Sequence, residues 1–108
     1  MEKDIFCKII EGEMDTDFLF ETEQLVVFKD IAPKAPVHYL VVPKKHITTI
    51  NDAEEEDREL LGNMMLAGKR TAKETGVEDG YKLIFNVGKN GGQEVPHIHL
   101  HILGGWGK

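Results

Sequence analysis

The chain has 108 residues, of which 30% are charged, with a formal net charge of −6 and a single cysteine, Cys7. That length predicts one domain over residues 1–108, and the acidic balance disfavours a nucleic-acid binder, because such proteins are normally basic. The unpaired cysteine fits a reducing compartment and no apolar stretch approaches the ~18–20 residues of a membrane span, so we expect a cytoplasmic protein with no membrane partner.

The first half of the chain predicts a short helix followed by strands. Apolar residues at 5, 6, 9 and 10 have helical spacing, and Gly12 follows as a stop signal. A loop with two prolines, 30–36, interrupts the apolar runs that are typical of strands. These strands are expected at residues 18–20, 25–28 and 38–42.

The second half is dominated by one long helix, predicted over residues 52–75. Asp52 suits its N-cap, Glu55 completes a capping-box pattern, and Gly76 suits the position after the helix. Five short strands, one long helix and a short N-terminal helix together predict an α+β fold with a mostly antiparallel sheet. The remaining elements are expected as strands at 81–86 and 97–103, with a glycine-rich loop at 88–92.

Three of the five histidines, His97, His99 and His101, alternate with apolar residues in one short run. A period of two predicts a strand with imidazoles on one face and aliphatic side chains on the other. The run alone leaves three interpretations open. It suits a metal site, nucleophilic catalysis by an imidazole, or an exposed polar strand face.

The loop before this run supplies uncharged hydrogen-bond donors. Its glycines allow backbone N–H groups to approach a ligand closely, and Asn86 and Gln93 add side-chain amides. A metal site would instead want a further carboxylate or thiolate at coordination distance. Loop and histidines together therefore favour a phosphate site.

The chain resembles the histidine-triad (HIT) family, and specifically its Hint branch of nucleoside phosphoramidases. The family signature, His-x-His-x-His-x-x with apolar x, matches residues 97–103 in full. Matching segments follow in the same order at 4–10, 28–36, 38–47, 86–93 and 103–105. The resemblance implies a HIT-like fold and a homodimer whose two sheets join edge to edge.

The resemblance also implies an activity, the hydrolysis of the P–N bond in purine nucleoside 5′-phosphoramidates. The substrate would be an AMP–amine or GMP–amine conjugate, or an aminoacyl adenylate, and no cofactor would be required. On this interpretation His99 attacks the α-phosphorus and forms a nucleotidyl-histidine. His101 would hydrogen-bond the phosphoryl oxygens, His97 would help to orient its neighbours, and His38 would complete the network.

Substrate-binding residues follow from the same resemblance. Asp30 would bind both ribose hydroxyls, and an apolar slot for the base would be formed by Ile5, Phe6, Ile9, Phe28 and Ile31. Each of these apolar residues also suits the core. The phosphoryl group would be bound by Asn86, Gly92, Gln93 and Glu94. Glu94 is included for its backbone only, because the branch often has Ser or Thr at that position.

Three alternatives remain. Some bacterial relatives bind structural zinc through Cys-x-x-Cys and two histidines, and the matching residues here are Asp4, Cys7, His46 and His97. Without a metal, Asp4 would be a helix N-cap and Cys7 a small buried residue. A different class of function is a nucleotide-binding adaptor with incidental hydrolysis. A second enzymatic possibility is a diadenosine polyphosphate hydrolase.

Overall fold

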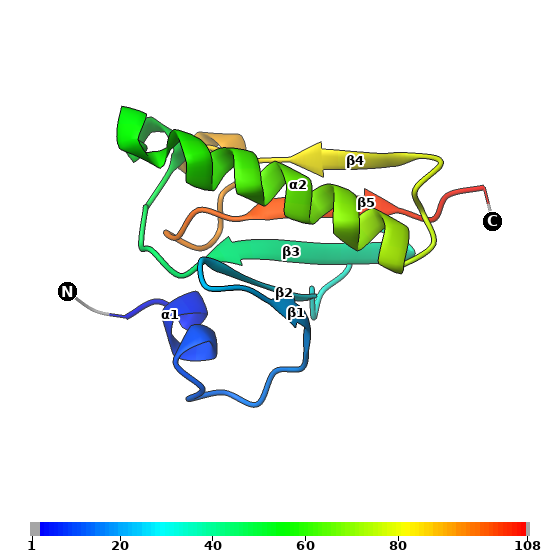
Figure 1. Ribbon diagram of the computed structural model, residues 1–108, viewed down its shortest axis with the longest axis horizontal. Coiled ribbons are helices and arrows are strands. Elements are labelled where there is room, and N and C mark those ends of the chain that lie inside the picture. The colour runs from blue at the N-terminus through cyan, green and yellow to red at the C-terminus, as the bar shows by residue number, and fades with distance from the viewer. Residues whose placement is uncertain (1–2, 108) are drawn as a thin grey trace.

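A computed structural model describes residues 3–107 and has one antiparallel five-stranded sheet of order β1-β2-β3-β5-β4 (Figure 1). The strands are β1 Phe18–Glu21, β2 Leu25–Lys29, β3 Val37–Pro43, β4 Tyr81–Ile84 and β5 Leu100–Gly104. The helices are α1 Ile5–Ile10 and α2 Arg58–Glu74, with short 3-10 turns at Ile50–Asp52, Glu55–Asp57 and Lys89–Gly91. The predicted α+β fold is confirmed.

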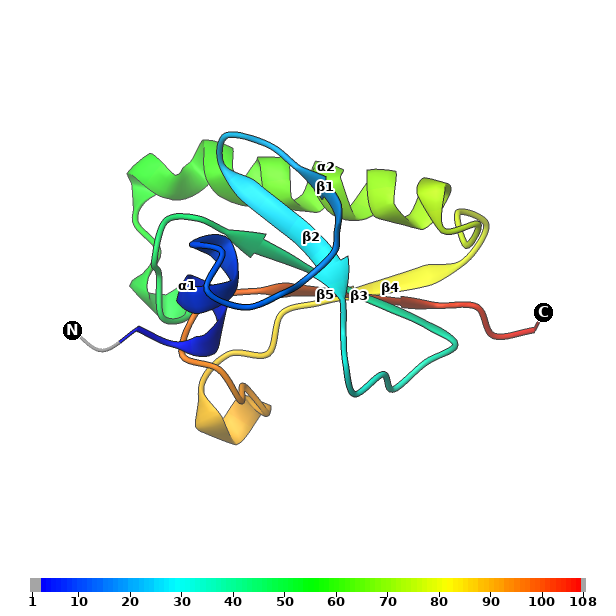
Figure 2. The ribbon, with the colours of Figure 1, turned by 90° about the horizontal axis from the view of Figure 1, so that it is seen from below.

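The two faces of the sheet have different partners, and Figure 2 shows α2 along one of them. Leu100 and Ile102 of β5 and Val41 of β3 pack in a core cluster with Leu60 and Met64 of α2. The opposite face carries a second cluster, in which α1 packs on β2 and β3. That cluster contains Phe6, Ile9, Val26, Phe28, Leu40 and Val42. No helix among residues 3–107 has the length and hydropathy needed to cross a bilayer.

The predicted helix 52–75 is wrong at its N-terminal end, because α2 begins only at Arg58. Two successive capping boxes divide the segment before it. Thr49 forms the first with Asp52, and Glu54 forms the second with Asp57. Each box closes a separate 3-10 turn, and the extended backbone of Ala53 between them prevents one continuous helix.

The predicted strand 97–103 is also too long, because β5 begins at Leu100. His97 N–H donates to the carbonyl of Val95, and Ile98 N–H donates to the carbonyl of Ile47. These bonds hold His97 and Ile98 outside the ladder that joins β5 to β3. Of the three histidines in the run, His101 alone lies on a strand.

Candidate functional site

Three histidines meet on the sheet face opposite α2. His38 comes from β3, His101 from β5, and His99 from the segment just before β5. The ring centroids of His99 and His101 are 4.8 Å apart, and those of His38 and His101 are 5.1 Å apart. The rings of His38 and His99 are buried, so the exposed polar strand face is excluded.

The proton positions of His38 and His101 follow from a backbone donor. The Lys34 N–H donates to His38 Nδ1 at 3.0 Å, so a neutral His38 carries its own proton on Nε2. That Nε2 lies 2.9 Å from His101 Nδ1 and 3.4 Å from Asp30 Oδ2. When His38 donates to His101 Nδ1, a neutral His101 carries its proton on Nε2, 3.3 Å from Asn86 Nδ2. Because Nδ2 can only donate, this tautomer requires the Asn86 amide to turn so that Oδ1 faces His101.

The proton of His99 is fixed by a backbone acceptor. His99 Nδ1 lies 2.7 Å from the carbonyl oxygen of His97, which can only accept, so Nδ1 carries the hydrogen. The lone pair of a neutral His99 is therefore on Nε2. The Phe6 ring packs edge-on against the imidazole, with centroids 4.9 Å apart, and holds its orientation.

Burial keeps these imidazoles neutral. It lowers the pKa of His38 and of His99, because the charged form loses hydration in the interior. Burial, together with the neighbouring His99 and His38, lowers the pKa of His101 to about 4. A neutral imidazole is the form that can act as a nucleophile.

We expect long-range ¹H–¹⁵N NMR to detect these proton positions directly. His99 should be the Nδ1–H tautomer and His38 and His101 the Nε2–H tautomer, and His101 should remain neutral until the pH falls to about 4. An Nε2–H signal from His99, or a His101 midpoint near 6.5, would contradict the arrangement.

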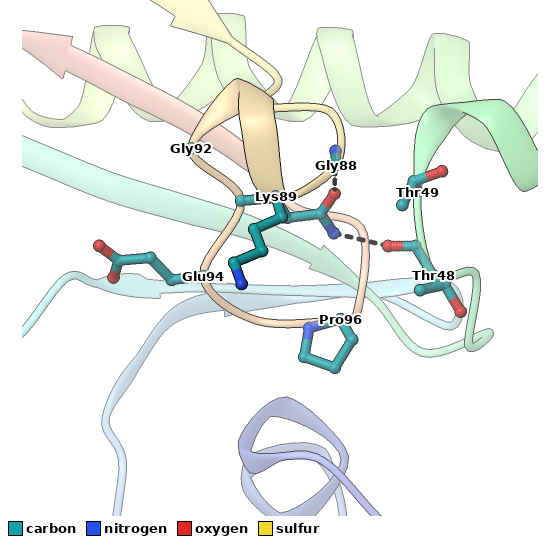
Figure 3. A pocket seen from close by; sticks show the side chains of 8 residues that line it. Thr48, Thr49, Gly88, Lys89, Gly92, Glu94 and Pro96 are labelled. Carbon is teal, nitrogen blue, oxygen red and sulfur yellow. Dashed lines mark hydrogen bonds between the residues drawn. The ribbon is translucent and has the colours of Figure 1, made fainter.

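The glycine-rich loop is braced by the Gln93 side chain (Figure 3). Gln93 Oε1 accepts from the Gly88 N–H at 2.9 Å, and Nε2 donates to the carbonyls of Thr48 and Val95 at 2.6 and 3.0 Å. Gly88 and Gly92 have φ of +72° and +85°, which other residues rarely adopt. The structure therefore uses the Gln93 amide within the protein, where sequence reasoning expected it to bind substrate.

Beside this loop lies an open cavity of about 610 Å³. Its lining includes Thr48, Lys89, Gly92, Glu94 and Pro96. Gly92 and Glu94 both line this cavity, but the Gly92 N–H that was expected to bind phosphate donates instead to the Lys89 carbonyl at 3.0 Å. The cavity places the segment after β3 opposite the loop, which the sequence pattern did not indicate.

The residues predicted for the nucleoside fall into two groups. Phe6, Ile9 and Phe28 are buried in the core, whereas Ile5 is 41% exposed and Ile31 is 95% exposed. Only the last two offer apolar surface to a ligand. Asp30 has Oδ1 bound to the Ala32 N–H at 2.9 Å, which fixes the carboxylate beside His38.

His97 points away from the other histidines and into a separate polar cluster. Its Nδ1 lies 3.1 Å from Asp4 Oδ2 and 3.7 Å from Cys7 Sγ, and the same carboxylate oxygen is 3.0 Å from His46 Nε2. Asp4 Oδ1 meanwhile accepts from the Cys7 N–H and caps α1. The three histidines of the run therefore do not share one metal site.

This cluster has the donor set of a metal site. One atom from each of Asp4, Cys7, His46 and His97 lies within 4.8 Å of the others. His97 Nε2 faces the Pro43 carbonyl at 2.8 Å, so both ring nitrogens of His97 face acceptors. With the ring proton on Nε2, His97 Nδ1 can accept from the Cys7 thiol at 3.7 Å, carry a second proton, or bind a metal cation. Burial opposes ionisation of Asp4, but hydrogen bonds from Cys7 and the nearby His97 outweigh it and lower the Asp4 pKa.

Comparison with known proteins covers nearly the whole chain. The family model described as scavenger mRNA decapping enzyme C-term binding matches residues 3–105. The purine nucleoside phosphoramidase of Escherichia coli (strain K12) is 44% identical over 105 residues, which are 96% of this chain and 88% of that protein.

Solved structures agree with the observed fold. A HIT family hydrolase from Legionella pneumophila Philadelphia 1 is 50% identical, with a TM-score of 0.92 over 95% of this chain and 93% of that one. A HIT family hydrolase from Clostridium thermocellum is 40% identical, with a TM-score of 0.94 over 99% and 94% of the two chains. The protein therefore belongs to the histidine-triad (HIT) family, among hydrolases of the same fold.

Proposed function

We propose that the protein hydrolyses the P–N bond of purine nucleoside 5′-phosphoramidates, namely AMP–amine and GMP–amine conjugates, and that it also accepts aminoacyl adenylates, in which the bond broken is the P–O bond to the acyl group. The observation that carries this proposal is the His99 imidazole, whose Nδ1–H is held by a carbonyl so that Nε2 keeps a free lone pair. The E. coli relative, a purine nucleoside phosphoramidase, supports the substrate class.

The reaction proceeds in two displacements at phosphorus. His99 Nε2 attacks the α-phosphorus, the P–N bond breaks, and its electron pair leaves with the nitrogen, which takes up a proton from solvent and departs as the amine. Water then attacks phosphorus, the bond to Nε2 breaks, and the water gives up a proton to solvent. The products are free His99 and a nucleoside monophosphate.

The surrounding groups stabilise charge on the phosphoryl oxygens. The Nε2–H of His101, the Asn86 Nδ2 group and the backbone N–H of Glu94 would donate to that charge, whereas the Gly92 N–H already donates to the Lys89 carbonyl. His38 orients His101 and does not relay a proton. Its Nδ1 already accepts from the Lys34 amide, so no proton can be taken up there.

Asp30 and two exposed side chains complete the proposed nucleoside site. The free lone pairs of the Asp30 carboxylate accept from the ribose hydroxyls, and Ile5 and Ile31 cover the base. Burying the exposed apolar surface of Ile31 against a purine would stabilise the complex by about 25 cal/mol per Å² removed from water.

The first experiment is amine release from adenosine 5′-phosphoramidate of a fluorescent amine. We expect steady release of amine together with AMP in equal amounts. AMP binding without any release would favour the nucleotide-binding adaptor, and cleavage of diadenosine polyphosphates in preference to the phosphoramidate would favour the other hydrolase.

We expect Gln93→Ala to lower kcat/KM about tenfold, through a lower kcat, because three hydrogen bonds that hold the glycine-rich segment 88–94, called the donor loop below, are lost. Loops displaced from reacting geometry by about 1 Å cost up to ~10²-fold in rate. Asn63, whose amide bonds Gln24 on the far side of the sheet, provides the control variant Asn63→Ala. A Gln93→Ala enzyme with wild-type kcat would exclude the bracing role.

We further propose a homodimer joined through β4. The sheet has two edges, β1 and β4, and the register shift between Phe18 and Phe20 makes β1 the poorer edge for pairing. Ile84 on β4 and Leu66 on α2 are exposed apolar side chains.

Light scattering should give about twice the chain mass of 12.2 kDa. The double variant Ile84→Lys, Leu66→Glu should give one chain mass.

The cluster around His97 supports a structural zinc site. Asp4 Oδ2, Cys7 Sγ, His46 Nε2 and His97 Nδ1 would hold the ion, and the Pro43 carbonyl fixes the His97 tautomer that leaves Nδ1 free. Zinc would add stability to the junction of α1 with the histidine segment and takes no part in the displacements. A thiolate ligand also suits the reducing cytoplasm, where we propose that the enzyme acts.

Elemental analysis should find one zinc per chain, and the His46→Ala variant should contain no zinc.

A further inference from the structure

One exposed ion pair crosses the rim of the site. Lys34 Nζ lies 4.0 Å from Glu94 Oε1, and the two side chains are 68% and 82% exposed. Lys34 belongs to the loop between β2 and β3, and Glu94 belongs to the donor loop before His97. The pair, called the rim pair below, therefore joins the two loops that flank the histidines.

The positive end of the rim pair lies towards His38 and His101. The Lys34 backbone bonds the His38 ring, and the charge of its side chain contributes to lowering the pKa of both histidines. A phosphoryl group bound by His101 would bring negative charge into reach of Lys34. Such a ligand competes with Glu94 for that ammonium.

The negative end lies at the cavity beside the donor loop. Lys89 and Glu94 are both among the residues that line it, and Figure 3 shows Lys89 extending from that loop on the side of Pro96 and Glu94 extending on the side away from Thr48 and Thr49. In an in-line displacement the leaving group departs opposite the attacking His99 nitrogen. Because the loop that carries Asp30 and Ile31 holds the nucleoside, the leaving amine must pass the other wall, which carries Glu94.

We propose that Glu94 is a specificity-determining residue that favours leaving amines with a second, positively charged group. This inference rests on the proposed P–N hydrolysis. When the phosphoryl group of a substrate pairs with Lys34, the Glu94 carboxylate loses that partner and can pair with a cation on the departing amine. An exposed pair of this kind contributes little stability, so substrate can separate it readily.

The test compares three AMP phosphoramidates of equal chain length. One leaving amine ends in trimethylammonium, the second in its uncharged tert-butyl isostere, and the third in a carboxylate. We expect the wild type to prefer the first over the second by about fivefold to tenfold in kcat/KM, and to disfavour the third. This preference should weaken at high salt, because exposed charges are screened within about 10 Å at 0.1 M ionic strength.

Two variants show how much of the preference comes from the Glu94 carboxylate. Glu94→Gln should bring the ratio between the trimethylammonium and tert-butyl substrates close to one, and Lys34→Gln should raise that ratio by removing the competing ammonium. Taking a ratio cancels any general loss of activity in a variant. Glu78→Gln makes the same charge change in the exposed connection between α2 and β4 and should keep the wild-type ratio.

The outcomes separate this inference from the proposed function. Release of all three amines with no preference, or a preference that survives Glu94→Gln, would overturn the inference and leave P–N hydrolysis standing. A fastest rate for the carboxylate substrate would also overturn it, because Lys34 and Lys89 would then dominate the exit. Release of none of the three would overturn both proposals.

Discussion

Replacing His99 with alanine should abolish turnover of a nucleoside phosphoramidate, with kcat lowered by about 10⁴-fold or more, as when other covalent enzymes lose their nucleophile. The physical reason is that Nε2 of His99 is the lone pair that the Nδ1–H bond to the His97 carbonyl leaves free. The measurement is single-turnover amine release, followed by mass spectrometry of protein quenched in alkaline denaturant, because the P–N bond of a nucleotidyl-histidine is labile in acid. The wild type should carry a nucleotidyl adduct on His99.

AMP binding distinguishes loss of chemistry from loss of the site. His99→Ala should still bind AMP, because Asp30, Asn86 and the donor loop are unchanged by the substitution. His101→Ala serves as the comparison and should retain more activity, since it removes a donor and keeps the nucleophile. A fall of less than tenfold in His99→Ala, or an adduct on another residue, would contradict the mechanism.

The second large effect is expected on stability. Asp4→Ala should lower the free energy of unfolding by about 2–4 kcal/mol, because it removes a helix N-cap and leaves buried groups of His97 and Cys7 without their charged acceptor. Its carboxylate, 7% exposed, caps α1 with one oxygen and contacts His97 and His46 with the other. The measurement is urea unfolding followed by circular dichroism, with a chelator present so that metal binding does not contribute.

Asp4→Asn is the matched variant, because asparagine caps a helix as well as aspartate does. Its side-chain N–H can also donate to His97 Nδ1, so its loss should be less than half that of Asp4→Ala. A loss of only about 1 kcal/mol in Asp4→Ala would mean that the residue acts as a cap alone.

The histidine run shows which part of the site the sequence can predict. The apolar positions Ile98, Leu100 and Ile102 do face the α2 core, because alternation reports burial directly. The same alternation failed for His97, whose ring leaves the other two and joins Asp4. What redirects it is the bond from Ile98 N–H to the Ile47 carbonyl, a contact across about fifty positions that no local pattern contains.

Polar side chains around the site were identified more easily than their roles. Gln93 stood out as a donor in a glycine-rich loop, yet its three bonds run to Gly88, Val95 and the Thr48 carbonyl. The predicted start of α2 was wrong for a related reason. Asp52 and Glu55 fit a capping box, but Thr49 and Glu54 occupy the actual cap positions, and a run of acids offers several competing registers.

Main-chain groups determine which ring nitrogen carries the hydrogen in the site histidines. The Lys34 N–H does so for His38, and the His97 carbonyl does so for His99. Main-chain groups are present whatever side chain follows them, and only proline at position 34 would remove the donor. Ordinary substitutions at either position leave the protonation pattern unaltered. The side chains of the loops around the nucleophile can therefore change in evolution and alter the leaving-group preference. The tautomer that makes His99 reactive stays the same through such changes.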